Sequence, residues 1–427
     1  MTMYGGGLEA AREEIAFAYE HVPFFRTHLD AAGIRPSRRM TAEEFAKIPA
    51  TAKPDYRSHF PTGIVARGAD LNDPLVIKTQ SSGTGGDRLT TVAHAYVLAE
   101  RLRASLTVNP PLAARISAPT PLRPVRYAAP NCSDVECANP RSRMGDRILP
   151  DGSLVLPVSH DLLATPADLV DQAIAEIEQF NPVGFDADAT HLAFLVRAFR
   201  RKGLRPPPEA LSLVLGYTRA TKVARRQITE FFPASAIAAE VLGMSELGWL
   251  VVECPRGGMH LNDRSFYAEL VAGDRPAEPG ELGDLVMTSL GDRLSPHIRY
   301  RTGDLYRMAP PCPCGHPFPA VLHEGRRRDC ITAGDEVVLT PREVDDLVGA
   351  AGFVDVYRLN QVDPGRCLFR FIPNERYAPG DEADLVARLA AALGDRLALT
   401  AAPVDYLTSD RSGKCVACQS AISAGGR

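Results

Sequence analysis

The stretch Lys78-Thr79-Gln80-Ser81-Ser82-Gly83-Thr84-Gly85-Gly86-Asp87-Arg88 decides how the rest of this sequence is interpreted. It follows an apolar run, 75–77, which predicts a buried strand. Three glycines within four positions let the backbone bend tightly and bring its N–H groups close to a ligand. Hydroxyl and basic side chains stand beside those N–H groups, so the loop suits the oxygens of a polyphosphate. A flexible surface loop is the alternative, and the ending of a Walker-type P-loop is missing.

The length, composition and net charge limit the classes of protein to which this chain can belong. The 427 residues are enough for two domains, and 45% hydrophobic with 23% charged residues is ordinary for a globular chain. A formal net charge of −4 gives no long-range attraction for nucleic acid or anionic lipid. We expect no membrane span, because no apolar run reaches about 18 residues, and no signal peptide at residues 1–20. We therefore expect a cytoplasmic protein, whose nine cysteines are thiols or metal ligands rather than disulfides.

Alternating strand and helix patterns predict an α/β fold with a parallel sheet covered by helices. We expect helices over 8–20, 91–106, 166–180, 189–202 and 220–232, and strands over 211–215 and 237–242. Thr165 should cap the helix that begins at Pro166. The tail, 330–427, predicts a small α+β unit in the order helix, strand, strand, helix, strand, with helices over 341–350 and 381–393 and strands over 354–359 and 367–372.

Four later stretches carry polar groups at positions where chemistry is common. Gly243-Met244-Ser245-Glu246 follows a strand, and the carboxyl ends of α/β strands often bind ligands. Tyr300-Arg301-Thr302-Gly303-Asp304 carries a carboxylate that can accept both hydroxyls of a cis-diol. Gly325-Arg326-Arg327-Arg328-Asp329 and Ser409-Asp410-Arg411-Ser412-Gly413-Lys414 are basic. A solvated Glu246, a hairpin turn at 302–304, a basic surface turn and an exposed lysine are the alternatives.

In order and spacing, these stretches resemble the motifs of the adenylate-forming enzymes. The first loop matches the family's Ser-Ser-Gly-Thr-Thr-Gly-Lys-Pro pattern at Ser81, Ser82, Gly83, Thr84 and Gly86, and departs from it at Gly85, Asp87 and Arg88. Tyr19-Glu20-His21-Val22-Pro23-Phe24-Phe25-Arg26 resembles the opening of phenylacetate–coenzyme A ligases. The resemblance implies a large N-terminal α/β adenylation domain, 1–324, and a small mobile α+β C-terminal domain, 325–427, which carries the catalytic lysine loop. The active site is expected between them.

The resemblance also implies roles for single residues. The phosphates of ATP would lie along 81–86, and Glu246 would be a catalytic ligand of Mg2+, which prefers hard oxygen donors. Residues assigned to the nucleotide are Gly216, Tyr217, Met244, Ser245, Asp304, which would accept the ribose hydroxyls, and Arg326 at a hinge over 325–329. Lys414 would be catalytic, because a cation offsets the repulsion between an attacking carboxylate and the α-phosphate. Rotation at the hinge would then admit a second nucleophile.

The implied function is ATP-dependent activation of a carboxylic acid, expected to be aryl, as an acyl-adenylate. Pyrophosphate leaves, and the acyl group passes to a thiol, that of coenzyme A. Transfer to a carrier protein or an amine, and an inactive nucleotide-binding homologue, stay open as alternatives. The segment 118–153 is unlike its family counterpart and leaves the acid undetermined. A homodimer is a further open question.

A separate set of thiol and imidazole groups suits a structural zinc ion: Cys254, His260, Cys312 and Cys314. The Cys-Pro-Cys-Gly turn can aim two sulfurs at one ion, and several phenylacetate–coenzyme A ligase relatives carry a similar set in this region. His316 is the rival fourth ligand, and cysteines that merely pack are the alternative to a metal. Four cysteines, Cys132, Cys137, Cys415 and Cys418, receive no role.

Overall fold

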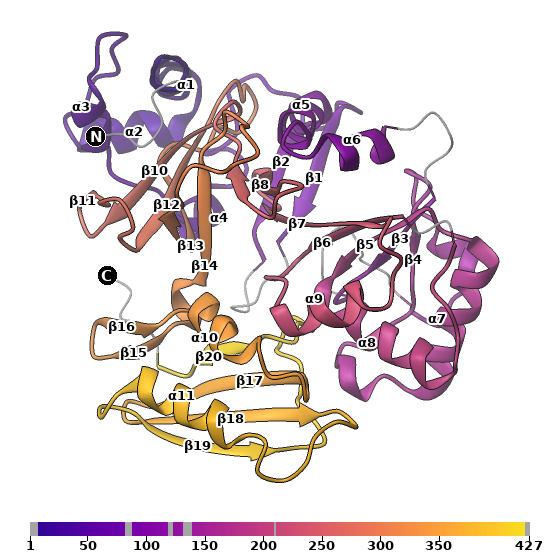
Figure 1. Ribbon diagram of the computed structural model, residues 1–427. Coiled ribbons are helices and arrows are strands. Elements are labelled where there is room, and N and C mark those ends of the chain that lie inside the picture. Colours follow the sequence, from indigo (N-terminus) through magenta and orange to yellow (C-terminus); the bar gives the residue numbers. More distant parts are fainter. Residues whose placement is uncertain (1–6, 82–87, 118–122, 131–138, 209–210, 423–427) are drawn as a thin grey trace. The chain divides into compact units, whose positions relative to one another are not determined.

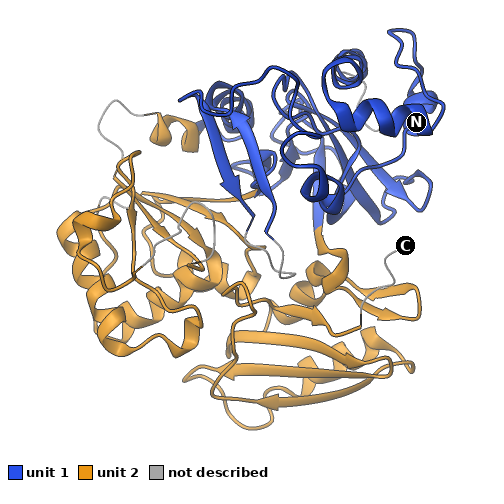
Figure 2. Cartoon of the chain, turned by 180° about the vertical axis from the view of Figure 1, so that it is seen from behind, with its two compact units in different colours: residues 1–110, 243–323 blue, residues 111–242, 324–427 orange. Residues whose placement is uncertain are grey.

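The computed structural model describes residues 7–81, 88–117, 123–130, 139–208 and 211–422. The chain forms two compact units (Figure 2). Unit 1 comprises Met1–Pro110 with Gly243–His323, and unit 2 comprises Pro111–Leu242 with Glu324–Arg427. Each unit is therefore built from two segments that are far apart in the sequence. Within the described ranges, no helix is long and apolar enough to cross a bilayer.

Unit 1 combines N-terminal helices with antiparallel strands (Figure 1). Its helices are α1 (Leu8–His21), α2 (Pro23–Ala31), α3 (Ala42–Ala46), α4 (Lys53–His59) and α5 (Ala95–Leu106). Its sheet follows the order β11 (Arg275–Pro276), β10 (Phe266–Ala272), β12 (Gly283–Ser289), β13 (Tyr300–Met308), β14 (Ala320–Arg326), β9 (Met259–Leu261) and β8 (Gly248–Glu253). A separate two-stranded sheet pairs β1 (Val76–Gln80) with β2 (Thr90–His94). Helix α1 buries Ala11, Ile15 and Ala18, whose spacing of three and four residues places them on one face.

Unit 2 contains the predicted parallel sheet and its covering helices (Figure 1). The strand order is β7 (Ile237–Met244), β6 (Ser212–Gly216), β5 (Gly184–Asp188), β3 (Pro124–Tyr127) and β4 (Leu154–Val155). The helices are α6 (Pro110–Ile116), α7 (Ala167–Phe180), α8 (Ala189–Arg201) and α9 (Lys222–Thr229). Because these strands are parallel, their carboxyl ends all face one edge of the sheet. The predicted elements at 189–202, 211–215, 220–232 and 237–242 are confirmed, and their ends differ from the prediction by three residues at most.

The rest of unit 2 contains the five elements predicted for the tail in the predicted order, with a hairpin before them and one further strand after them that were not predicted. A hairpin, β15 (Ile331–Ala333) and β16 (Glu336–Leu339), precedes α10 (Pro341–Val348), β17 (Val354–Asp363), β18 (Arg366–Pro373), α11 (Ala383–Leu393), β19 (Ala398–Pro403) and β20 (Cys418–Ser420). The sheet order is β19-β18-β17-β20, and α11 packs on β19. Arg226 of α9 donates to the carbonyls of Gly349 and Val354, so this part is bound to the α9 region. The predicted domain boundary lies between residues 324 and 325. The chain enters unit 2 one residue earlier, at Glu324. A separate mobile C-terminal domain stays a prediction.

Three local predictions are wrong. The strand at β1 forms, but Leu75 is 55% and Ile77 40% exposed, because among the described residues β1 pairs with β2 alone and one face of this ribbon stays open. Residues 91–94 belong to β2 rather than to a helix, which begins at Ala95. Thr165 does not cap α7: its hydroxyl accepts the N–H of Ser159, and Pro166 occupies the cap position.

Candidate active site and metal cluster

The start of the glycine-rich loop lies beside the segment that carries Glu246 in unit 1. The hydroxyls of Thr79 and Thr91 lie 2.7 Å apart, and each is 3.3 Å from the carbonyl oxygen of Ser245. Ser81 is buried, and its Oγ accepts the N–H of Leu89 at 2.9 Å. The structure therefore brings Thr79, two residues before Ser81, into contact with the Met244–Glu246 stretch. The predicted residues Ser82, Gly83, Thr84 and Gly86 lie outside the described residues, as do Cys132 and Cys137.

Glu246 occupies the tight turn between β7 and β8 and is only 6% exposed. Its Oε1 accepts a hydrogen bond from the Tyr300 hydroxyl at 3.3 Å and lies 3.5 Å from Nζ of Lys53. Thr51 fixes this arrangement, since it exchanges backbone bonds with Arg299 and Arg301 on either side of Tyr300. A carboxylate held in this way presents oxygen atoms, the donors that Mg2+ prefers.

A buried ion pair supports the residue after Glu246. Arg101 and Asp292 are bonded at 3.1 Å, and each is 2% exposed or less. Arg101 also donates to the carbonyl of Leu247 at 3.4 Å and lies over the Phe266 ring. The backbone next to Glu246 is therefore tied to the core of unit 1.

His297 lies in the same buried region. Its ring stacks on Tyr56 with centroids 4.3 Å apart and meets the edge of Tyr300 at 5.1 Å. Neither ring nitrogen has a hydrogen-bond partner among the described residues. Burial lowers the pKa of His297 to about 4, so the imidazole is neutral near pH 7.

Asp304 lies in a bulge of β13, which is neither a hairpin turn nor a regular strand. The pairing with β12 shifts between Asp284 and Val286, so residues 302–304 face a single partner, Leu285. Gly303 has φ +80, and the Thr302 hydroxyl donates to the carbonyl of Leu285 at 3.0 Å. Asp304 is half-buried in this bulge.

In unit 2, the candidate residues gather at the carboxyl ends of the parallel strands. Gly216 ends β6, and Tyr217 follows with φ +65, a left-handed conformation that bulky residues rarely adopt. The next residue, Thr218, is anchored by its hydroxyl, which donates to Asp188 at 2.5 Å. The Tyr217 carbonyl accepts a hydrogen bond from Nζ of Lys414 at 2.9 Å. Lys414, predicted to be catalytic, is 8% exposed.

The loop around Lys414 is organised by its own carboxylate. Oδ1 of Asp410 accepts bonds from the N–H and hydroxyl of Ser412, at 2.8 and 2.6 Å, and from the N–H of Lys414 at 2.9 Å. Gly413 has φ +84, and a β-carbon there would lie 3.0 Å from the carbonyl oxygen of His160. The tip of the loop therefore has one compact shape.

Arg326, predicted to contact the nucleotide, is the last residue of β14 and belongs to unit 2. The residue before it, Gly325, has φ +107, and a β-carbon there would lie 2.5 Å from Cγ of Pro341. Glu324 is fully buried and bonded to Thr340 and Arg342. A glycine is thus required at this predicted hinge.

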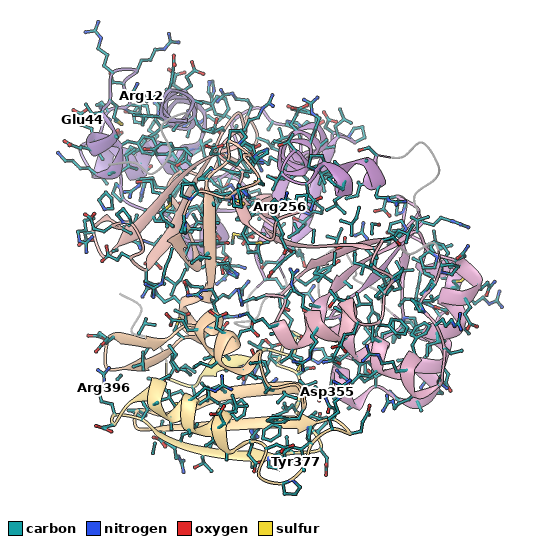
Figure 3. The ribbon with its side chains drawn as sticks, in the orientation of Figure 1. Arg12, Glu44, Arg256, Asp355, Tyr377 and Arg396 are labelled. Carbon is teal, nitrogen blue, oxygen red and sulfur yellow. The ribbon has the colours of Figure 1, made fainter. Side chains whose placement is uncertain are left out.

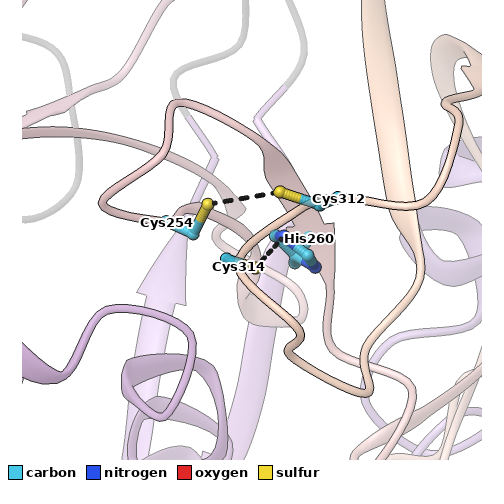
Figure 4. Close-up of side chains that lie close together, drawn as sticks. All are labelled: Cys254, His260, Cys312 and Cys314. Atoms are coloured by element: carbon cyan, nitrogen blue, oxygen red, sulfur yellow. Dashed lines mark hydrogen bonds between the residues drawn. The ribbon is translucent and has the colours of Figure 1, made fainter.

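The predicted zinc ligands form a cluster in unit 1 (Figure 4). The ligand atoms of Cys254, His260, Cys312 and Cys314 all lie within 4.8 Å of one another. The sulfurs of Cys254 and Cys312 are 3.7 Å apart, and Sγ of Cys314 is 3.2 Å from Nε2 of His260. Gly258 makes this approach possible, because a β-carbon there would lie 2.7 Å from Sγ of Cys312.

Hydrogen bonds orient the cluster. Nδ1 of His260 is 2.7 Å from the Phe318 carbonyl, so Nδ1 carries the proton and Nε2 is left to bind a metal. Burial raises the pKa of Cys254 to about 11, whereas a hydrogen bond from the Cys314 backbone lowers that of Cys312 to about 7. Arg256, labelled in Figure 3, lies exposed in the turn that follows Cys254.

The rival ligand His316 is directed elsewhere. Its Nδ1 accepts the N–H of Phe318 at 3.1 Å, and its Nε2 lies 3.2 Å from the Thr107 hydroxyl. The four residues named above therefore form the favoured donor set.

Sequence reasoning gave no role to Lys53 and Tyr300, which contact Glu246, or to Asp161, which accepts the N–H of Ser409 at 3.1 Å in the segment before Lys414. Tyr300 is 54 positions from its partner Glu246. No local pattern signals such pairs, although Tyr300 does stand in a stretch with a family resemblance.

Known proteins resemble this chain in sequence and in fold. No protein-family model matches the chain. A phenylacetate–coenzyme A ligase of Thermus thermophilus is 30% identical over 323 residues, which are 72% of this chain and 67% of the relative. The phenylacetate–coenzyme A ligase of Escherichia coli is 27% identical over 345 residues, 77% of this chain and 70% of the relative.

Solved structures share the fold. A 2-hydroxyisobutyryl-CoA ligase in the postadenylation state gives a TM-score of 0.72 over 96% of this chain and 89% of that one, at 19% identity. An anthranilate CoA ligase in complex with anthranoyl-AMP gives 0.53 over 79% and 65%, at 14% identity. The predicted α/β fold is thereby confirmed. Taken with the sequence relatives, the chain belongs to the phenylacetate–coenzyme A ligase family of adenylate-forming enzymes, and it is an AMP-forming carboxylate–coenzyme A ligase.

Proposed function

We propose that this enzyme activates an aryl carboxylic acid and that Lys414 and Glu246 carry the first chemical step. The curated relatives are named for phenylacetate, an aryl acid, and this supports the aryl class. The observation that carries the residue assignment is the placement of Lys414 at the carboxyl ends of the parallel strands. Its Nζ there lies 2.9 Å from the Tyr217 carbonyl.

In the first step, a carboxylate oxygen of the acid attacks the α-phosphorus of ATP. The bond to the β-phosphate oxygen breaks, pyrophosphate leaves, and the acyl-adenylate remains. Lys414 lowers the barrier because its ammonium group offsets the repulsion between the two anions. A backbone carbonyl is a neutral acceptor, so this contact orients Nζ without neutralising its charge.

Unit 1 would supply several of the groups that hold the nucleotide, and Gly216, Tyr217 and Arg326 of unit 2 would supply others. The loop after Ser81 would offer N–H groups to the phosphates, and Asp304 would accept the ribose hydroxyls. Glu246 would hold Mg2+, which screens phosphate charge when bound. Lys53 and Tyr300 keep the carboxylate oriented through the contacts described above.

In the second step, the thiol of coenzyme A attacks the acyl carbon, the thiol proton is lost, and AMP leaves. Lys414 has finished its task by then. We propose that rotation near Gly325 withdraws it, since Gly325 adopts a conformation that side chains disfavour.

We also propose that Cys254, His260, Cys312 and Cys314 hold a structural zinc ion. Thiolate and imidazole are the ligands zinc prefers, and four of them close a tetrahedral site. The hydrogen bond from His260 to Phe318 leaves Nε2 free for the metal.

One assay tests the function. The protein is incubated with ATP, Mg2+ and a panel of aryl and aliphatic carboxylic acids, and acid-dependent pyrophosphate exchange is followed. We expect exchange with an aryl acid, and then thioester formation when coenzyme A is added. Carrier protein and free amines serve as the competing acceptors. Nucleotide binding without exchange for any acid would instead indicate an inactive homologue.

Metal analysis tests the zinc site. The purified protein should contain about one zinc per chain. Cys312→Ser and Cys314→Ser should lose it, while His316→Ala, the matched control, should retain it. Full zinc occupancy in both cysteine variants would contradict the ligand assignment. Zinc lost in the histidine variant as well as in the two cysteine variants would make His316 the fourth ligand. The same samples, analysed by sedimentation, report whether the chain forms a homodimer.

A further inference from the structure

The segment that precedes Lys414 is bound to residues 160–162 of unit 2 by a compact set of hydrogen bonds. The Asp161 carboxylate accepts bonds from the Tyr406 hydroxyl, from the Thr408 hydroxyl at 3.0 Å and from the N–H of Ser409 at 3.1 Å. The N–H of Leu162 donates to Oγ of Ser409 at 3.0 Å. These bonds connect positions about 247 residues apart in the chain.

A further contact extends the set toward the tip of the loop. Nε2 of His160 lies 3.1 Å from the carbonyl oxygen of Arg411. Gly413 approaches the His160 carbonyl so closely that a side chain would crowd it. The chain from 406 to 413 therefore lies along 160–162.

This contact set is largely open to water, unlike the tip it supports. Tyr406 is 46% exposed, Thr408 and His160 are exposed, and Asp161 is half-buried, whereas Ser412, Gly413 and Lys414 are buried. Water can satisfy the polar groups of the exposed set when its bonds break, so each bond contributes only about 1 kcal/mol. The hydrogen bonds of Tyr406 and Thr408 can therefore exchange with water, while Leu407 between them is buried in the core of unit 2 and would have to leave it when the segment opens.

The tip does not need Asp161 to keep its own shape. Asp410 organises Ser412 and Lys414 through bonds inside the loop. Release of the exposed set would therefore move a preformed loop, and would not unfold it.

We propose that Asp161, with Tyr406 and Ser409, is a reversible latch that holds Lys414 in place for adenylation and opens before thioester formation. Asp161 is a positioning residue and touches no reacting atom. The proposal rests on the proposed role of Lys414, but the latch itself can be measured without activity.

The structural test measures the exposure of Lys414 in the full chain. A brief pulse of acetic anhydride, read by mass spectrometry at Lys414, reports the fraction of molecules with the loop released. Asp161→Ala removes the acceptor of three hydrogen bonds, and we expect labelling to rise about tenfold, the equivalent of about 1.4 kcal/mol. Tyr406→Phe should give a smaller rise. Asp405→Ala, the matched control, removes an exposed carboxylate that makes no bond with the described residues and should label like the parent.

The functional test separates the two half-reactions. With the acid selected by the exchange assay, Asp161→Ala should lower pyrophosphate exchange two- to tenfold. It should leave unchanged, or accelerate, thioester formation from supplied acyl-adenylate and coenzyme A. Unchanged Lys414 labelling in both latch variants would overturn the proposal. So would an equal loss of both half-reactions. Raised labelling in a protein that shows no exchange would retain the latch and reject the proposed function.

Discussion

Glu246 in unit 1 and Lys414 in unit 2 are held in place by opposite kinds of contact. Glu246 lies above a buried ion pair, Arg101–Asp292, and beside buried aromatic rings. Lys414 is buried too, and the segment leading to it combines one buried anchor, Leu407, with half-buried and exposed hydrogen bonds to Asp161. Buried polar contacts are costly to break, while exposed ones exchange with water. A Mg2+ ligand that must stay in place, as proposed for Glu246, would need the buried kind of contact. A cation that must move, as proposed for Lys414, would need the kind that exchanges with water.

The largest expected effect concerns the cation itself. Lys414→Ala should lower acid-dependent pyrophosphate exchange by at least about a hundredfold, as for other losses of transition-state charge stabilisation. Thioester formation from supplied acyl-adenylate should be nearly unchanged. The two rates are measured separately, with ATP binding by calorimetry as the control for folding. Exchange within a few fold of the parent would remove Lys414 from the mechanism.

The buried contacts next to Glu246 are tested by measuring the free energy of unfolding. Arg101→Met leaves Asp292 as an unpaired buried charge and should cost about 3–5 kcal/mol in urea unfolding. On the same helix, Arg103→Met breaks an exposed pair with Glu100, bonded at 2.7 Å, and should cost less than about 1 kcal/mol. Equal costs for the two variants would mean that burial does not distinguish these pairs.

His297 gives the buried region a pH dependence. Its pKa is lowered by burial to about 4 from 6.5, so the unfolded chain binds the proton more tightly than the folded one. Stability should therefore fall as the pH drops from about 6.5 toward about 4, by about 2–3 kcal/mol in total. In His297→Phe, unfolding free energies measured across this window should lose that part of the slope. If the unfolding free energies of the parent and of His297→Phe changed with pH in parallel, His297 would not be the source of the pH dependence.

The latch should contribute least to overall stability. Asp161→Ala removes half-exposed hydrogen bonds, and we expect its free energy of unfolding to fall by less than about 1–2 kcal/mol. The measurement is the same urea titration, with Asp405→Ala beside it. A loss as large as that of Arg101→Met would place Asp161 among the structural residues and remove the contrast between the two regions.

The sequence allowed the order of elements to be predicted where hydrophobic periodicity is local. Helix α8 and strand β6 are examples, because their buried faces can be read from spacing alone. The grouping of Cys254, His260, Cys312 and Cys314 could also be predicted, since cysteine and histidine at short spacings have few other uses. Leu75 and Ile77 were wrongly predicted to be buried, because an apolar run does not tell how many strands will flank it.

The residues that hold Glu246 and the Lys414 loop in place could not be predicted from the sequence. Lys53 and Tyr300 reach Glu246, and Asp161 reaches Ser409, only after distant segments have packed. The bulge at Asp304 was also beyond prediction, since its shape depends on the register with β12. In each case a backbone arrangement decides which side chains meet.

The left-handed backbone at Tyr217 has a consequence for anyone who would engineer this enzyme. A bulky residue in that conformation carries about 1–3 kcal/mol of strain, which glycine would avoid. A glycine would retain the carbonyl that orients Nζ but would delete the aromatic ring. The chain thus keeps a thermodynamically poor residue at this point, and a selection for heat resistance alone would be drawn to change it, at the risk of a weaker catalyst.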